Sequence, residues 1–197
     1  MSTSDVWAIT PSTDDDRYRA DASISGAGAL TLITNDAGVN GIGYKIDITS
    51  AGNDTGITFT IVGHKVGDLT GTATTEVVTG ANAGAATSTN FYAYIESITA
   101  SGASAGNVKI GTTGSLALPR TRIRGFQYVG NSSAGTVVFN LNSTSGAELL
   151  KVNTPASATA TQQMSIPGAG ILTTRGSNTD FAIMTLDQVA LITVFCG

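Results

Sequence analysis

Apolar residues alternate with threonines between two glycines at residues 56–63, and this alternation constrains the fold more than any other stretch of the chain. Ile57, Phe59 and Ile61 share one parity, and the two threonines between them share the other. Because successive side chains of a β-strand point to opposite faces, the pattern predicts a strand with one buried face. Similar alternations recur between glycine-rich turns, and no window carries a sustained 3.6-residue apolar stripe. The sequence therefore predicts an all-β fold of the sandwich or jelly-roll kind.

A second alternation immediately precedes this strand. Residues 43–49 place Tyr44, Ile46 and Ile48 on one face, and the polar turn at residues 53–56 leads into the strand that follows. Turn residues of this kind between two alternating segments favour a β-hairpin. We therefore expect the two strands to pair with each other across the turn.

The second half of the chain resembles the first in its order of turns and strands. The turn and strand at residues 131–139 match those at 53–59, and Glu148 takes the place of Glu76 in the strand expected at 74–79. In that strand we expect Glu76 to face outward and one of the two following valines to face inward. Matched positions of this kind suggest an internal repeat and a structural or solvent-facing role for the two glutamates, rather than a glycosidase pair.

These patterns predict two small β-sandwich units in tandem, with jelly-roll-like character. We expect an extended N-terminal arm at residues 1–22, a first domain at 23–115 and a second domain at 116–197. The stretch 114–119 is interpreted as a linker, because the residue before a proline is held extended. Units of this size have small cores, so we expect them to pack on each other or on other subunits.

The charge content narrows the classes of partner. Charged residues make up 12% of the 197 residues, and the formal net charge is −4. An acidic balance argues against a nucleic-acid binder that depends on phosphate contacts. A weakly charged surface fits either coverage by neighbouring subunits or a soluble protein rich in Thr and Ser. We expect neither a secretory signal nor a transmembrane helix, and Cys196, the single cysteine, leaves no intrachain disulfide.

Two charged segments are candidate contact regions. The three aspartates at residues 14–16 could bind a divalent cation or form a solvated acidic loop. Arg120, Arg122 and Arg124 alternate, so in a strand they share one face. That face could grip a carboxylate-rich partner, contact the other domain or protect an exposed sheet edge. The candidate contacts with other subunits are Trp7, Asp14, Asp15, Asp16, Arg17, Tyr18, Arg19, Arg120, Arg122 and Arg124.

No catalytic constellation is evident, so we expect no enzyme activity, no cofactor and no metal site. His64 is the only histidine, which makes a multi-histidine metal site impossible and favours a surface or interface role. Cys196 stands beside apolar residues and is interpreted as a small buried or terminal residue. The glycine-rich turns match no phosphate-binding fingerprint. Four aromatic residues could form a sugar-stacking platform or belong to a core, namely Trp7, Tyr18, Tyr92 and Tyr94.

The strand and turn segments resemble bacteriophage particle proteins. The first half is similar to jelly-roll-like particle proteins of short-tailed marine and freshwater phages, through residues 55–63, 75–80 and 98–102. The second half resembles a small β-sandwich unit of virion structural proteins of tailed phages, through residues 165–171, 178–181 and 192–195. The resemblance implies a role on the particle rather than an activity.

On this basis we expect a capsid decoration (cement) protein on the outer surface of the phage head. Its partners would be the major capsid protein and copies of itself, most simply as a trimer, with no nucleic acid and no membrane. A surface rich in backbone edges can bind such neighbours by shape and strand addition. A tail or head-to-tail adaptor subunit is the alternative, and a host-glycan-binding module is an alternative of another class.

Overall fold

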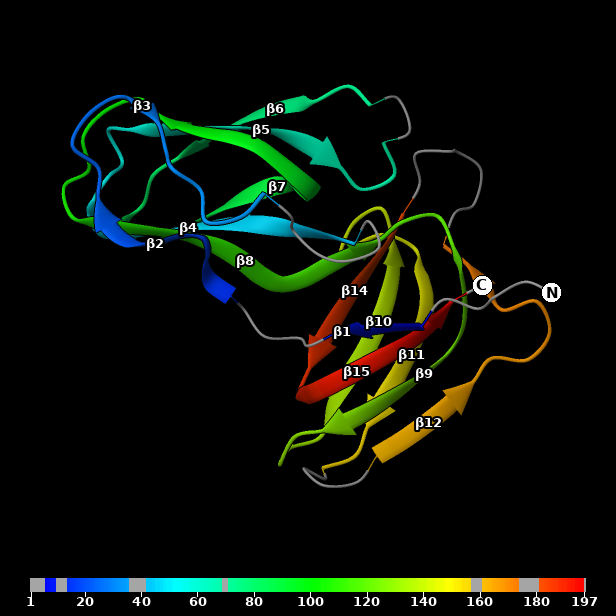
Figure 1. Ribbon diagram of the computed structural model, residues 1–197. Coiled ribbons are helices and arrows are strands. Elements are labelled where there is room, and N and C mark those ends of the chain that lie inside the picture. Colours follow the sequence, from blue (N-terminus) through cyan, green and yellow to red (C-terminus); the bar gives the residue numbers. More distant parts are fainter. Residues whose placement is uncertain are drawn as a thin grey trace. The chain divides into compact units, whose positions relative to one another are not determined.

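The computed structural model describes residues 6–9, 14–35, 42–68, 71–156, 161–173 and 181–196, with side chains from residue 14 onward (Figure 1). Within these ranges every regular element is a β-strand, so the all-β prediction is confirmed. This part of the chain contains no helix long and apolar enough to cross a membrane. The strands are β1 (Val6–Ile9), β2 (Asp14–Ser23), β3 (Gly28–Ala29), β4 (Gly43–Asn53), β5 (Thr58–Lys65), β6 (Thr74–Thr79), β7 (Asn82–Ala100), β8 (Asn107–Leu118), β9 (Arg122–Gly130), β10 (Gly135–Leu141), β11 (Glu148–Thr154), β12 (Thr161–Ser165), β13 (Ile171–Leu172), β14 (Ala182–Asp187) and β15 (Val189–Cys196).

The chain divides into two compact units. The N-terminal unit comprises Thr13–Thr113, and the C-terminal unit comprises Met1–Ser12 together with Gly114–Gly197. The expected extended arm at residues 1–22 is wrong, because this range holds β1 and β2. β1 pairs antiparallel with β15, and β2 pairs antiparallel with β8. Each strand thus belongs to the sheet of a different unit.

The expected linker at residues 114–119 is also wrong. β8 continues to Leu118, and its last three residues pair with β14. Leu116, Ala117 and Leu118 are fully buried. The extended conformation that Pro119 favours is therefore used to continue a strand, and the apolar side chains before it enter a core.

The N-terminal unit is a sandwich whose two layers share the long strand β7. The first half of β7 pairs with β4 and its second half pairs with β5, and Tyr92 takes part in both pairings. Figure 1 shows β5 and β6 on one side of the unit and β2, β8 and β4 on the other. Strand β7 therefore carries the chain of hydrogen-bonded strands from one layer into the other.

Strands β4 and β5 do not form the expected hairpin, and that prediction is wrong. They follow each other in sequence, but β7 lies between them in the strand order. The chain passes from one layer to the other through a tight turn in which the Ile57 N–H donates to the Asp54 carbonyl at 3.0 Å. Two strands that each have one apolar face can bury those faces against each other across a core, and this arrangement replaces edge-to-edge pairing.

The core of this unit contains the inward rows that the alternation predicted. Ile46 and Ile48 of β4 are fully buried, as are Phe59 and Ile61 of β5, and Ile57 packs partly buried against the same cluster. Full burial of a side chain of this size contributes about 1.5–3 kcal/mol to folding. Other fully buried members of the cluster are Tyr18, Tyr92, Ile95, Ile98, Val108 and Ile110.

The C-terminal unit consists of two packed sheets. One has the order β1-β15-β9-β12, with β13 also pairing with β9, and the other contains β11, β10, β14 and the end of β8. Phe126 of β9 and Phe139 of β10 are both fully buried, with ring centroids 5.9 Å apart. Because these rings come from different sheets, they mark the core between them. Cys196 is buried, as predicted.

The suggested internal repeat extends over one hairpin. β5 pairs with β6 in the N-terminal unit, and β10 pairs with β11 in the C-terminal unit. Beyond this hairpin the units differ, because β7 pairs with β5 whereas β12 pairs with β9.

Candidate functional site

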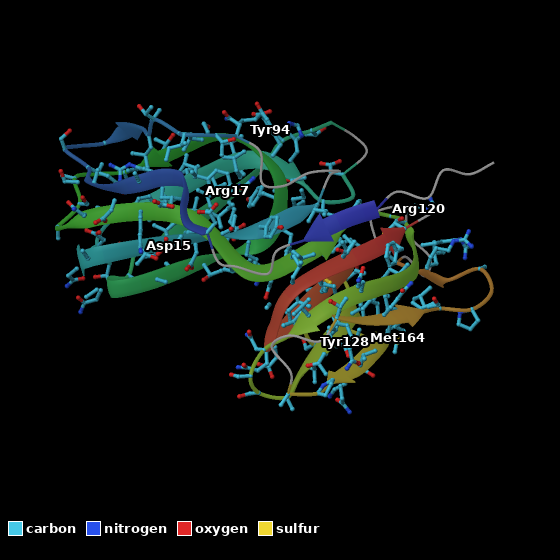
Figure 2. All side chains as sticks on the ribbon, turned by 60° about the horizontal axis from the view of Figure 1, so that its bottom comes forward. Asp15, Arg17, Tyr94, Arg120, Tyr128 and Met164 are labelled. Atoms are coloured by element: carbon cyan, nitrogen blue, oxygen red, sulfur yellow. The ribbon has the colours of Figure 1, made fainter. Side chains whose placement is uncertain are left out.

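The three aspartates lie on strand β2 and not in a loop. The Asp15 carboxylate forms an ion pair with the Lys109 ammonium of β8. A carboxylate oxygen of Asp14 lies 3.7 Å from a guanidinium nitrogen of Arg17. The hydrogen bond to Asp15 raises the pKa of the Lys109 ammonium. Asp15 and Asp16 are exposed, and Figure 2 shows Asp15 and Arg17 on the N-terminal unit. The aspartates therefore act first as cross-strand and local charge partners.

Two other predicted contact residues lie on β2, and the structure gives each a place within its own unit. Tyr18 is buried, so its predicted contact role is wrong, and the Arg19 guanidinium is already hydrogen-bonded. Tyr18 is fully buried in the core, so it cannot contact another subunit. The Arg19 guanidinium donates to the carbonyls of Ala22 at 2.7 Å, Ser23 at 3.0 Å and Val108. The bond to Val108 joins β2 to β8, and the bonds to Ala22 and Ser23 stay within β2, where the register with β8 shifts on both sides of Arg19. Arg19 is thus a positioning residue within the unit.

The arginine stripe is partly formed. Arg122 and Arg124 lie on β9 and flank the buried Ile123, so they share a face as predicted, while Arg120 precedes the strand. Arg124 is skipped in the pairing of β9 with β15, where Gly125 faces Phe195 and Ile123 faces Cys196. Arg120 and Arg124 are exposed. β9 is an interior strand of its sheet, and an irregularity of this kind can redirect a side chain there, which leaves Arg124 exposed on the surface.

For Trp7 the structure describes the backbone. It lies on β1 opposite Val194 of β15. Its side chain falls outside the described residues, so its expected contact role stays a prediction.

A shallow hollow of about 320 Å³ lies beside Arg19, lined by that residue and by residues 23–31. Apart from Arg19, Ile24 and Leu30, the lining consists of Ser, Gly, Ala and Thr. Since the Arg19 guanidinium already donates to carbonyls, the hollow presents no obvious group for catalysis or for holding a cofactor.

A polar cluster of the N-terminal unit surrounds Glu76, and the sequence did not predict it. Glu76 and the buried Val78 are two positions apart on β6, so their side chains share the inward face of the strand. The expected outward orientation of Glu76 is therefore wrong. Its carboxylate accepts hydrogen bonds from the N–H of Thr89 at 2.5 Å, the N–H of Asn90 at 3.2 Å, the side-chain amide of Asn90 at 2.8 Å and the hydroxyl of Tyr92 at 3.1 Å. The cluster therefore ties strand β6 to strand β7.

Hydrogen bonding keeps this carboxylate ionised. Burial by itself would raise the pKa of Glu76, but the donors of Thr89, Asn90 and Tyr92 outweigh it and lower the pKa below its ordinary value of 4.5. Burial also raises the pKa of the Tyr92 hydroxyl, and the Glu76 charge raises it further. All four donors point at one acceptor, so the cluster is a structural anchor and lacks the opposed acid and base of a catalytic pair.

The outer face of β5, β6 and β7 is the exposed surface that sequence reasoning overlooked. Val77 is 60% exposed and Tyr94 is 41% exposed. The Nε2 atom of His64 lies 2.9 Å from Oε1 of Glu96. The ring centroid of His64 is 6.1 Å from that of Tyr94, which Figure 2 labels. His64 is therefore a surface residue, as expected. Only the pairing of β5 with β7 could have revealed these neighbours, because the residues are some 30 positions apart in sequence.

The proposed sugar-stacking platform does not assemble. Tyr18 and Tyr92 are buried in the core, which leaves Tyr94 as the exposed aromatic among the three described tyrosines of that set. Within the described ranges, no group of three or more His, Cys, Asp or Glu side chains is arranged to hold a metal ion.

Comparisons with protein-family models, curated proteins and solved structures found no match. The resemblance to phage particle proteins therefore stays a prediction from strands and turns.

Proposed function

We propose that the protein is a bacteriophage virion structural protein that acts as a capsid decoration protein. The proposal begins from the resemblance of its strand and turn segments to phage particle proteins. The observation that carries it furthest is the outer face of β5, β6 and β7, where Thr, Val and Tyr side chains lie exposed. A weakly charged sheet surface of this kind binds neighbours by shape and backbone pairing, as attachment to a protein shell requires.

The charged contacts would orient the protein on the shell. Among the predicted contact residues, Asp15, Asp16, Arg120 and Arg124 have exposed side chains, and Asp15 is ion-paired with Lys109. Asp16 and Arg124 thus offer one charge of each sign for complementary pairing with the major capsid protein, which favours specificity and register more than affinity. Copies of this chain, as a trimer around a joint of the shell, remain part of the proposal.

Binding to emptied capsids tests the proposal directly. A ligand that binds only the assembled shell stabilises it by about 2.7 kcal/mol at a free concentration of 100 times its Kd. We expect the recombinant protein to cosediment with emptied capsids and to raise their melting temperature in calorimetry. Cosedimentation with tails while heads stay bare would instead support the tail or adaptor alternative.

A pair of charge reversals gives a matched control. Arg124→Glu should weaken attachment, because Arg124 lies exposed at the β9 bulge. Lys151→Glu on β11 changes the charge of the same unit by the same amount at another exposed position and should leave attachment unchanged. Equal binding by the two variants would contradict the role given to the arginine stripe. Binding to a glycan array in the absence of capsid binding would favour the glycan-binding alternative.

A further inference from the structure

The strand β6 is an unprotected sheet edge. Among the described residues it pairs with β5 alone, and it stands last in the strand order of its sheet. Its six pairs with β5 run from Thr58↔Thr79 to Gly63↔Thr74 without a register shift. Edge strands of soluble proteins are normally protected by lysine, proline, a bulge or an inward-pointing charge that disturbs pairing. β6 contains neither lysine nor proline, and it has no bulge.

The one charged residue of β6 points inward, but its charge is already satisfied within the same chain. The Glu76 carboxylate accepts hydrogen bonds from Thr89, Asn90 and Tyr92. It therefore opposes the approach of another strand less than an unsatisfied inward charge would. The opposite face of the strand carries Thr75, Val77 and Thr79, all exposed, with Val77 60% exposed. An incoming strand thus meets backbone groups that pair with no strand in the described ranges, beside uncharged β-branched side chains that favour β-pairing.

We propose that β6 pairs antiparallel with β6 of a second copy of this chain, so that the two sheets become continuous across a twofold axis. A pairing of identical strands about a twofold axis is self-complementary and closes with two copies, so it would join subunits of two different proposed trimers rather than the subunits of one. Side chains that face the core must stay on one face of the joined sheet. Directly opposed residues must therefore both be even-numbered or both be odd-numbered.

Charge selects the register. Two registers of the required parity give the greatest overlap of Thr74–Thr79 with itself. One places Glu76 opposite Glu76, which like-charge repulsion disfavours. The other places Val77 opposite Val77, Thr75 opposite Thr79 and Glu76 opposite Val78. This second register forms favourable β-branched pairs, and it is the one we infer.

Site-directed disulfides test both the contact and its register. Directly opposed residues of antiparallel strands have Cα atoms about 4.5–5.5 Å apart, which suits a disulfide. The single native cysteine, Cys196, is buried and does not compete. Under mild oxidation, Val77→Cys should form a covalent dimer on a non-reducing gel roughly tenfold or more faster than collision alone permits. Ile33→Cys is the matched control, because Ile33 is 66% exposed and lies outside β6.

The flanking threonines test the register. In the inferred pairing the Thr75 residues of the two copies are offset by four positions along the strands. This offset is about 13 Å, which is too far for a disulfide. Thr75→Cys and Thr79→Cys should therefore crosslink slowly when separate and rapidly when mixed. Rapid crosslinking of either variant alone would overturn the register, and a Val77→Cys rate equal to that of Ile33→Cys would overturn the contact.

The association state supplies an independent measurement. Val77→Lys adds the edge charge that β6 lacks, and it should shift sedimentation equilibrium toward the smaller species at equal melting temperature, whereas Ile33→Lys should not. Unchanged association in Val77→Lys would overturn the proposal. The contact does not depend on the proposed role on a capsid, because both tests use the purified protein without capsids.

Discussion

Removing the Glu76 carboxylate should destabilise the N-terminal unit, because Glu76 is the single acceptor for donors from three residues. In Glu76→Ala, the N–H of Thr89, the N–H and side-chain amide of Asn90 and the hydroxyl of Tyr92 lose their partner. A hydrogen bond to a charged group contributes about 1.5–3 kcal/mol when well buried. Thr89 is exposed and Glu76 is only half-buried, so water replaces part of this. We expect a net loss of about 2 kcal/mol.

Differential scanning calorimetry measures this loss. For a unit of about 100 residues, 2 kcal/mol corresponds to a fall of about 10 °C in melting temperature. Glu148→Ala is the matched control, because Glu148 is exposed on the corresponding strand of the C-terminal unit. That substitution should leave the stability of the protein within about 0.5 kcal/mol of its original value.

The pH dependence separates the carboxylate charge from the loss of packing. The pKa of Glu76 is lowered in the folded protein, so its contribution is present above 4.5 and is lost as the pH falls through the folded value. Glu76→Gln cannot titrate. Its stability should therefore lie below that of the original protein at pH 7, and the two should converge as the pH falls through the lowered pKa of Glu76. A difference between the two proteins that stays constant throughout the acid titration would refute the electrostatic argument.

Two further substitutions and one deletion test the fold. Phe59→Ala should cost about 3–5 kcal/mol and lower the melting temperature of the N-terminal unit, because Phe59 is fully buried in its core; an unchanged melting temperature would contradict that placement. Asp54→Ala should cost about 1–3 kcal/mol in urea denaturation, because its carboxylate accepts the Ala105 N–H at 2.6 Å in a buried turn; an unchanged midpoint would contradict that role. Deletion of residues 1–22 should abolish the cooperative melt of the N-terminal unit, because Tyr18 belongs to its core; a folded, fully stable product would restore the interpretation of this segment as an arm.

Period-two alternation predicted local structure well where one face is buried. The inward rows Ile46 and Ile48, and Phe59 and Ile61, could be assigned before any pairing was known, because the pleat forces alternate side chains to opposite faces. Glu76 could not be assigned in this way. Two valines follow it, so either parity offers an apolar residue to the core, and only the position of Asn90 and Tyr92 on β7 decides the question.

The sequence by itself determined the strand content, the turns and most of the buried faces, since these depend on spacing over a few residues. Which strands pair was decided only by the tertiary structure, because pairing joins residues far apart in the chain. β4 turns away from β5 and pairs with β7, and residues taken for an arm supply Tyr18 to a core. The exposed edge at β6 follows from the same cause, because a strand is an edge only by virtue of what the rest of the chain leaves unpaired.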